Sequence, residues 1–277
     1  MSRTVDLLVS ILRMLAIAAG VVCVAGTVRA DGAFRVCANP NNLPFSNAEG
    51  EGFENRLAEL VARDLHETVA YLWTNEHEHF VRKTLNAGKC DVLMGVPAGF
   101  DEVETTVPYF TSGYVFVYRE DRGIHLSSMR DPRLRTLKIG VHLIGDDNTP
   151  PMEALARQGI TQNIAGYMIY RDTQVKGHSR LIDDVANGKL DVAAVWGPLG
   201  GYYAKKAAAP LKVSFVNDTA SFAPAVFQYS IALGVRKGDA TLKAQLNRIL
   251  VQERPAIRNL LRRYGVPLMD SPARTAG

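Results

Sequence analysis

The chain has 277 residues, of which 47% are hydrophobic, and a formal net charge of +4 at pH 7. This length is sufficient for two domains of ordinary size, each with its own hydrophobic core. No run of basic residues is longer than a pair, so we expect no nucleic-acid partner.

Residues 1–30 have the pattern of a cleavable signal peptide. Arg3 and Arg13 flank an apolar start, residues 14–26 are apolar, and Val28-Arg29-Ala30 places small residues where signal peptidase cleaves. No later segment has the roughly 18 apolar residues that a spanning helix needs. We therefore expect export to the periplasm, with no membrane span.

After this segment, strand and helix patterns follow each other along the chain. Phe34 to Ala38 alternates as a strand does, and Asn39 to Asn47 is a polar loop stiffened by two prolines. Apolar residues at helical spacing predict a helix at Phe53, Leu57, Leu60, Val61 and Leu65. Further strands are expected at 69–73, 138–142, 165–170 and 212–216, and further helices near 80–85, 181–185, 202–208, 242–250 and 255–261. This alternation indicates an α/β fold.

One short motif occurs twice, about a hundred residues apart. Gly88-Lys89-Cys90-Asp91-Val92 recurs as Gly188-Lys189-Leu190-Asp191-Val192, and each copy continues into an apolar strand and a Gly/Pro segment. Each copy fits a helix that ends at glycine, followed by a buried strand. The chain is therefore predicted to contain two similar α/β lobes that face a cleft.

The lobes are expected to be joined by two extended crossings. The first lies near residues 107–118 and the second near 227–235, with hinges at 107–113 and 224–230. Accordingly we assign 31–110 to the first part of lobe 1 and 111–225 to lobe 2. Residues 226–277 are assigned to the return crossing and to C-terminal helices that pack back on lobe 1. Each lobe is expected to hold a mixed sheet flanked by helices.

Cys37 and Cys90 are the two cysteines that remain after signal cleavage. In an oxidising compartment an even pair favours a disulfide over two buried thiols. The two cysteines are expected on the first and third strands, which are neighbours in the usual 2-1-3 strand order. In the chain-entropy model such a long closed loop contributes about 4 kcal/mol.

The order of elements resembles the type II periplasmic solute-binding proteins of ABC transporters, family 3-like. The paired Gly-Lys-x-Asp-Val strands, Val107-Pro108-Tyr109 and residues 231–239 carry this general likeness. A narrower likeness lies in residues 35–47, in Gly52-Phe53-Glu54-Asn55, and in 105–110. These segments resemble the quinoprotein-dehydrogenase-associated proteins of the MoxJ/XoxJ type, from methanol-oxidation systems. That resemblance implies a periplasmic accessory of a pyrroloquinoline-quinone (PQQ)-dependent methanol dehydrogenase, whose lobes close by hinge bending.

The predicted cleft lacks the charged residues with which amino-acid receptors of this fold bind their ligand. Such receptors offer an arginine after the third strand and an acid after its counterpart in lobe 2, whereas residues 99–104 contain no arginine and Trp196 stands at the second place. Asp146 and Asp147 occupy the helix-start loop, where an anionic ligand would otherwise sit. The residues expected to line the cleft offer aromatic rings and amides, and they are Asn39, Asn41, Asn42, Phe45, Met94, Pro97, Tyr109, Asp146, Trp196 and Pro198. Burial of Phe45, Met94 or Tyr109 in the lobe cores is the alternative for those three.

Two lesser candidates concern metal ions. Residues 76–79 read Glu-His-Glu-His, which could bind a metal ion. If the lobes close, Asp101, Glu102 and Glu104 could form a site for a hard cation together with Asp146 and Asp147 of lobe 2. Solvated surface charges explain both patterns more simply, so no metal and no cofactor is predicted.

We therefore expect a monomeric, non-enzymatic binding protein that assists a PQQ-dependent methanol dehydrogenase by binding it during maturation or activation. No nucleophile and base are paired in the sequence as hydrolysis would need. The alternative is an ABC-transporter receptor for a small neutral or aromatic solute.

Overall fold

The structure is a computed structural model that describes residues 32–74, 79–144, 147–169 and 178–270. From Ala33 onward these residues belong to one unit of the chain. The predicted signal peptide, Asp146 and residues 76–78 of the Glu-His-Glu-His tract lie outside the described residues. None of the described helices is long and apolar enough to cross a membrane.

Lobe 1 is built around a parallel three-stranded sheet. Strand β1 (Ala33–Ala38) lies between β4 (Thr68–Trp73) and β5 (Val92–Pro97), and it is parallel to both. The second strand, the first and the third are thus neighbours in that order, as the sequence predicts. The other elements of this lobe are the hairpin β2 (Asn41–Asn42) and β3 (Ser46–Asn47), β6 (Glu104–Thr105), α2 (Phe53–Leu65), α3 (Phe80–Lys83), α7 (Ala240–Gln252) and α8 (Arg254–Arg263).

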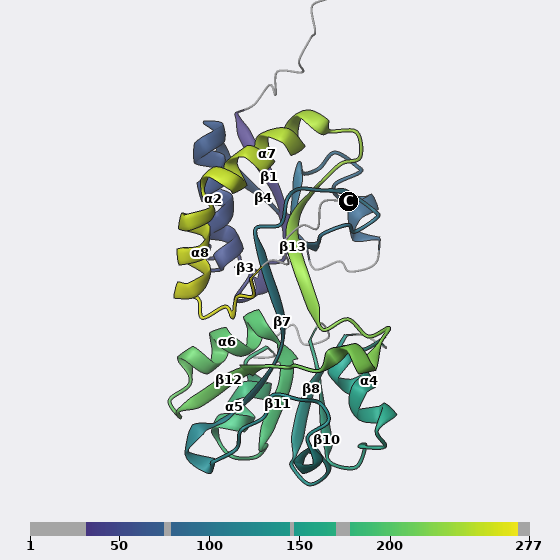
Figure 1. Cartoon of the computed structure of the whole chain (residues 1–277). Coiled ribbons are helices and arrows are strands. Elements are labelled where there is room, and N and C mark those ends of the chain that lie inside the picture. Colours follow the sequence, from purple (N-terminus) through teal and green to yellow (C-terminus); the bar gives the residue numbers. More distant parts are fainter. Residues whose placement is uncertain (1–31, 75–78, 145–146, 170–177, 271–277) are drawn as a thin grey trace, which may run out of the picture. The chain divides into compact units, whose positions relative to one another are not determined.

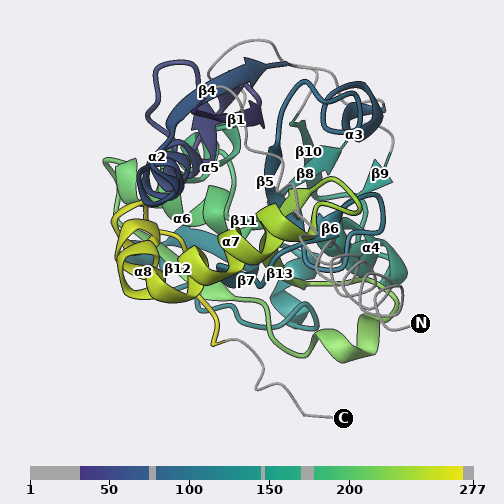
Figure 2. The ribbon, with the colours of Figure 1, turned by 90° about the horizontal axis from the view of Figure 1, so that it is seen from above.

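Helix α2 supplies much of the core of lobe 1. Its apolar positions Phe53, Leu57 and Val61 recur every four residues, so all three fall on one face, and each is at most 1% exposed. Figure 2 shows α2, α7 and α8 together, and contacts between each pair of these helices agree. The C-terminal helices therefore pack back on the first lobe.

Lobe 2 repeats this plan. Strand β8 (Ile139–Ile144) lies between β10 (Ile164–Met168) and β11 (Val192–Trp196), again parallel to both. The remaining elements are β9 (Asp147–Asn148), β12 (Leu211–Phe215), α4 (Pro150–Arg157), α5 (Arg180–Ala186) and α6 (Gly197–Lys206). Short 3-10 turns lie at Glu120–Arg122, Pro132–Arg135 and Thr219–Phe222.

Two long strands connect the lobes. Strands β7 (Phe110–Arg119) and β13 (Gln228–Val235) pair with each other in antiparallel fashion at residues 110–113 and 228–231 (Figure 1). Beyond this junction β7 continues along β11, and β13 continues along β5. The strand order β10-β8-β11-β7-β13-β5-β1-β4 is therefore symmetric about the junction.

The duplicated motif has the same structural role in both lobes. The side chain of Asp91 accepts a hydrogen bond from the backbone N–H of Arg35 at 3.2 Å, and Asp191 accepts one from Lys138 at 2.8 Å. Each aspartate thus fastens the start of its strand to the neighbouring first strand. Gly88, with φ of +71°, takes the left-handed conformation that glycine adopts without strain.

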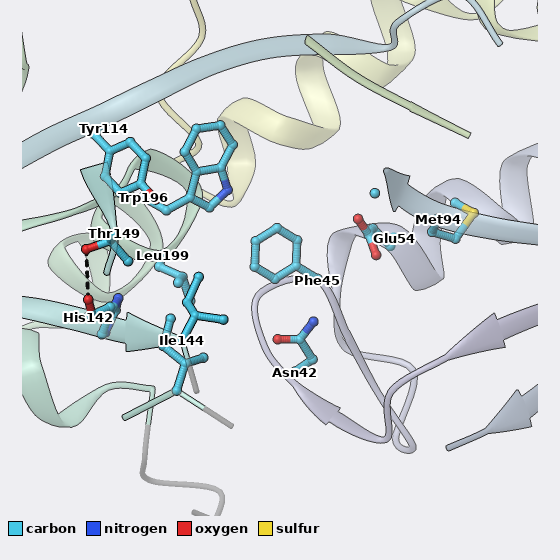
Figure 3. Close-up of a pocket in the computed structure, with 12 residues that line it drawn as sticks. Asn42, Phe45, Glu54, Met94, Tyr114, His142, Ile144, Thr149, Trp196 and Leu199 are labelled. Atoms are coloured by element: carbon cyan, nitrogen blue, oxygen red, sulfur yellow. Dashed lines mark hydrogen bonds between the residues drawn. The ribbon is translucent and has the colours of Figure 1, made fainter. Parts of the chain in front are cut away.

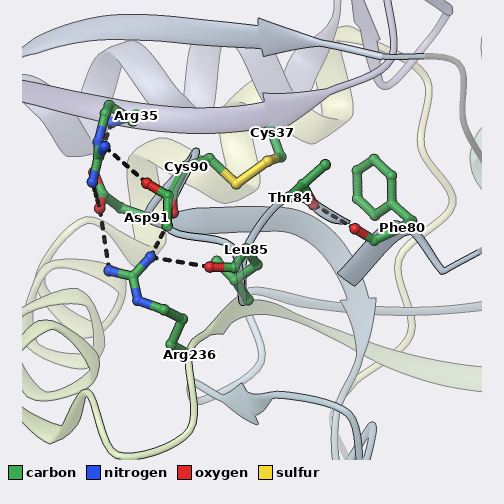
Figure 4. The surroundings of a disulfide bond; sticks show 9 residues. Arg35, Cys37, Phe80, Thr84, Leu85, Cys90, Asp91 and Arg236 are labelled. Carbon is green, nitrogen blue, oxygen red and sulfur yellow. Dashed lines mark hydrogen bonds and ion pairs between the residues drawn. A yellow bond between two sulfur atoms is a disulfide. The ribbon is translucent and has the colours of Figure 1, made fainter. Parts of the chain in front are cut away.

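The predicted disulfide between Cys37 and Cys90 is present, and it links β1 to the loop before β5 (Figure 4). Beside it, Asp91 is only 2% exposed and lies between two guanidinium groups, Arg35 at 2.7 Å and Arg236 at 3.4 Å. Arg236 also donates to the carbonyl oxygen of Cys90 at 2.6 Å. The covalent bond and the ion pairs therefore hold the same corner of lobe 1.

One predicted loop is helical. From the sequence, Gly197 and Pro198 are expected in a loop after the strand, with a helix from Tyr202, whereas α6 begins at Gly197. Proline is well suited to the first turn of a helix because its missing N–H has no intrahelical partner there. Pro198 is consequently buried at the start of α6.

Candidate functional site

A cavity of about 230 Å³ lies between the two lobes, close to the β7–β13 junction (Figure 3). Its lobe 1 wall comes from the β2–β3 hairpin, the first turn of α2 and the middle of β5. Its lobe 2 wall comes from β8, the ends of β10 and β11, and α6. The lining residues are Asn42, Phe45, Glu54, Met94, Gly95, Tyr114, His142, Ile144, Thr149, Ile169, Trp196 and Leu199.

The hairpin loop of lobe 1 is fixed to the start of α2. The N–H groups of Phe53 and Glu54 each donate to a loop carbonyl, those of Pro44 and Phe45, at 2.8 Å. The side-chain oxygen of Asn55 accepts from the N–H of Gly52 at 3.0 Å, which satisfies one of the free donors of the helix terminus. Loop and helix start therefore present Phe45 and Glu54 to the cavity as one piece.

Glu54 is the charged group of this wall. It is 7% exposed, and its Oε1 accepts a hydrogen bond of 3.1 Å from the hydroxyl of Tyr109. Burial raises the pKa of Glu54 to about 7, and the Tyr109 bond offsets only part of that shift. Gly95 makes room for the carboxylate, because a Cβ atom there would lie 2.4 Å from Oε1.

His142 stands on the opposite wall, in β8. It is 3% exposed, and neither ring nitrogen has a hydrogen-bond partner among the described residues. Burial lowers the pKa of His142 to about 3, and the nearby His178 adds to the shift. The ring is therefore neutral at physiological pH, with one nitrogen that can donate a hydrogen bond and one that can accept.

Aromatic side chains cover the cavity on the side of the junction. Trp196, at the end of β11, contacts Tyr114 of β7 and Tyr229 of β13, each with ring centroids 5.7 Å apart. Figure 3 shows Phe45 lying between the indole of Trp196 and the carboxylate of Glu54 in that view. The cavity thus combines aromatic faces with one carboxylate and one neutral imidazole.

The lobes also touch directly beside the cavity. The carbonyl oxygen of Leu43 accepts a hydrogen bond of 3.1 Å from the hydroxyl of Tyr203 in α6. Nδ1 of His178 lies 3.3 Å from the same oxygen, while Nε2 lies 3.1 Å from the carbonyl oxygen of Ile169. The hairpin loop that carries Phe45 is therefore held by both lobes.

The structure distributes the predicted site residues over several environments. Asn42, Phe45, Met94 and Trp196 line the cavity. Asn39 lines an adjoining hollow of about 350 Å³ in lobe 1, which shares Asn42, Glu54 and Met94 with the cavity.

The remaining predicted residues lie elsewhere. Asn41 and Pro97 are exposed, Pro198 is buried in α6, and Tyr109 is 8% exposed behind Glu54. Asp146 falls outside the described residues.

Sequence reasoning missed the two polar groups that distinguish the cavity. Glu54 stands in the first turn of a helix, where an acidic residue is common because it complements the helix dipole. His142 ends the run Lys138-Ile139-Gly140-Val141, which reads as a buried strand. The available signal was the strand end itself, since ligands of α/β folds bind where parallel strands terminate.

The acidic residues considered for a cation do not form a cluster in the part of the chain that is described. Glu104 pairs with Lys243 at 2.9 Å, which explains its position without an ion. No group of three metal-ligating side chains is present among the described residues. The Glu-His-Glu-His tract is represented there only by His79, which is exposed.

Comparisons with known proteins agree with this architecture. The family model of the bacterial extracellular solute-binding proteins, family 3, matches residues 34–265. MoxJ of Methylorubrum extorquens is 31% identical over 253 residues, which cover 86% of this chain and 82% of that protein.

Two solved structures are similar over their whole length. MxaJ from Methlophaga aminisulfidivorans MPT has a TM-score of 0.76 and 28% identity, and the match covers 85% of this chain and 100% of that one. The periplasmic binding protein XoxJ from Methylobacterium extorquens AM1 has a TM-score of 0.70 and 32% identity, covering 86% and 100%. The chain has the type II periplasmic binding protein fold, and it belongs to the bacterial extracellular solute-binding proteins of family 3 as a protein of the MoxJ/XoxJ type.

Proposed function

We propose that this protein is a periplasmic accessory of a PQQ-dependent methanol dehydrogenase, which it binds during maturation or activation. The observation that carries the proposal is the likeness to MoxJ, MxaJ and XoxJ, which extends over more than four fifths of the chain. Proteins of this type resemble receptors but accompany methanol-oxidation systems. The protein itself would perform no catalysis.

The cavity supports a role different from amino-acid transport. Its described lining contains no lysine or arginine, so a ligand carboxylate would enter without a cationic partner and would lose its hydration uncompensated. Aromatic anchors such as Phe45 and Trp196 are what protein interfaces favour. The cleft would therefore accept a segment of the dehydrogenase, with the lobes moving at hinges near residues 107–113 and 224–230.

The proposal is tested with the apo form of a PQQ-dependent methanol dehydrogenase from the same organism. Biolayer interferometry with the immobilised accessory should show saturable binding, and a deletion strain should contain dehydrogenase of reduced specific activity that the added protein restores. Phe45→Ala at the cavity is the test variant, and Val251→Ala on the exposed face of α7 is its matched control, since both shorten a hydrophobic side chain. Absence of binding together with full activity in the deletion strain would remove the proposal.

A second function is favoured by one observation: His142 lines a cavity of molecular size, and its imidazole has no hydrogen-bond partner among the residues that the structure describes. Such a site suits a receptor that delivers a small solute to an ABC transporter. A thermal-shift screen separates the two functions. A solute that raises the melting temperature by several degrees, without any dehydrogenase binding, indicates the receptor.

A further inference from the structure

We propose that the cavity between the lobes binds an alkylammonium group, with Glu54 as its counterion and the rings of Phe45 and Trp196 around its alkyl chain. The inference rests on the proposed function and deepens it, because it names the chemical group that the partner or the solute would present to the cleft.

The first argument is the isolation of the carboxylate. Glu54 is almost fully buried, its hydrogen bond comes from the neutral hydroxyl of Tyr109, and no lysine or arginine lines the described wall of the cavity. A buried carboxylate without a counter-charge is unfavourable, and the raised pKa of Glu54 reflects that cost. An entering ammonium would supply the missing charge.

The second argument is that the same wall disfavours the competing ligand classes. An anion would face Glu54 with no lysine or arginine among the described lining residues to offset the repulsion. A zwitterionic amino acid would gain an ion pair at its ammonium but would bury its carboxylate unpaired. A group that carries a positive charge and no negative one therefore fits this lining best.

The aromatic residues and the volume set the rest of the ligand. A cation close to the face of a tryptophan or phenylalanine ring gains additional attraction, so Trp196 and Phe45 would favour an ammonium over a neutral group of equal size. A cavity of about 230 Å³ lies below the usual range for drug-sized ligands. The site therefore suits a short alkyl chain.

His142 provides the independent sign that the cavity is built for a ligand. The residue is 3% exposed and lines the cavity, and both of its ring nitrogens are unpaired within the described part of the chain. Because burial keeps the ring neutral, it would not repel an ammonium across the cavity. It would pair instead with a neutral polar group of the same ligand, such as a hydroxyl or a peptide amide.

The alkylammonium group could come from either of two sources. A free small amine could fill the cavity alone. Alternatively, a lysine side chain of the dehydrogenase could enter it, with the backbone of its loop in the adjoining hollow of about 350 Å³ that also touches Glu54.

The decisive experiment is isothermal titration with propylammonium chloride, with 1-propanol and sodium propionate as neutral and anionic isosteres. Propylammonium should bind, propionate should not, and propanol should bind at least tenfold more weakly. Glu54→Gln should weaken propylammonium by about thirtyfold or more, because it removes one partner of a buried charge pair. Glu59→Gln is the matched control on the same helix, since Glu59 is exposed and pairs with Arg56, and it should leave the affinity within twofold.

The lysine source is tested in parallel with the complete dehydrogenase. If Glu54→Gln and acetylation of the dehydrogenase lysines each weaken that complex while Glu59→Gln does not, the ammonium comes from the partner. If wild type binds propylammonium but no dehydrogenase, the proposed function fails and this inference stands. The inference is overturned and the function stands in either of two cases, provided that the dehydrogenase still binds. In the first, 1-propanol binds as tightly as propylammonium. In the second, Glu54→Gln changes the affinity for neither ligand.

Discussion

Replacing Glu54 by glutamine should change how the stability of this protein depends on pH. Glu54 titrates at about 7 in the folded protein against an ordinary value of 4.5. The folded state therefore holds a proton that the unfolded state has lost between these values. Stability from this group is complete below pH 4.5 and is lost as pH rises toward 7. At 1.36 kcal/mol per pKa unit the loss is about 3 kcal/mol.

His142 has the opposite effect. Its pKa is about 3 in the folded protein against an ordinary 6.5, so between these values the unfolded state binds the extra proton. Stability from His142 is complete above pH 6.5 and is lost as pH falls toward 3, by about 5 kcal/mol in all. Between pH 4.5 and 6.5 the slopes of Glu54 and His142 cancel in the wild-type protein.

The Glu54→Gln variant removes the contribution of Glu54 to the pH dependence of stability and leaves that of His142. Urea unfolding followed by tryptophan fluorescence at pH 4 to 8 should show Glu54→Gln gaining about 3 kcal/mol on the wild type between pH 4 and pH 8. Glu59→Gln, on the exposed side of the same helix, should differ from the wild type by less than about 0.5 kcal/mol throughout. A difference between Glu54→Gln and wild type that stays constant within 1 kcal/mol over this range would refute the argument that Glu54 is buried without a counterion.

Three further predictions concern the scaffold around the site. Asp91→Asn should lower the free energy of unfolding by about 3 kcal/mol, measured in urea, because it removes the buried negative charge that pairs with the guanidinium groups of Arg35 and Arg236. The equivalent change at the half-buried Asp191 should lower it by only about 1 kcal/mol, and equal losses would contradict this account. Reduction of the Cys37–Cys90 disulfide, which spans 53 residues, should lower the melting temperature by about 8 °C in calorimetry; an unchanged value would show that the bond is not formed. Tyr203→Phe should weaken the contact between the lobes by about 1 kcal/mol and speed hydrogen exchange in residues 43–47, whereas unchanged exchange would show that this bond does not restrain the loop.

The sequence permitted prediction of the features that repeat or that follow a local period. The two Gly-Lys-x-Asp-Val motifs identified the paired lobes, because a glycine stop and a buried strand are local signals. The bounds of α2 follow from its four-residue apolar spacing, and the disulfide follows from the order of its strands. Gly197-Pro198 predicts a loop because Gly-Pro usually marks a turn. The same dipeptide also suits the first turn of a helix, and here Pro198 lies in the first turn of α6.

The polar content of the cavity could not be predicted in the same way. An acid in a first helical turn is normally solvated, and Glu54 is buried only because the hairpin loop closes over it. Similarly, whether the ring nitrogens of His142 find a partner among the described residues depends on elements outside its own strand. Both facts arise from tertiary contacts, such as the hydrogen bond between Tyr109 and Glu54, which are 55 residues apart, and such contacts leave no local pattern.

Burial of Glu54 would also connect ligand charge with the movement of the lobes that we propose. If the lobes separated at β7 and β13, water would reach the cavity and hydrate the carboxylate, so the ionised form would carry little cost. Closure on an empty cavity would remove that hydration, and closure at neutral pH would become less favourable by up to the same 3 kcal/mol. A cationic group inside the cavity would offset this cost, while a neutral group would not. Charge selection by Glu54 and closure of the lobes would then be one equilibrium, in which a ligand shifts the closed population only by its differential affinity for that state.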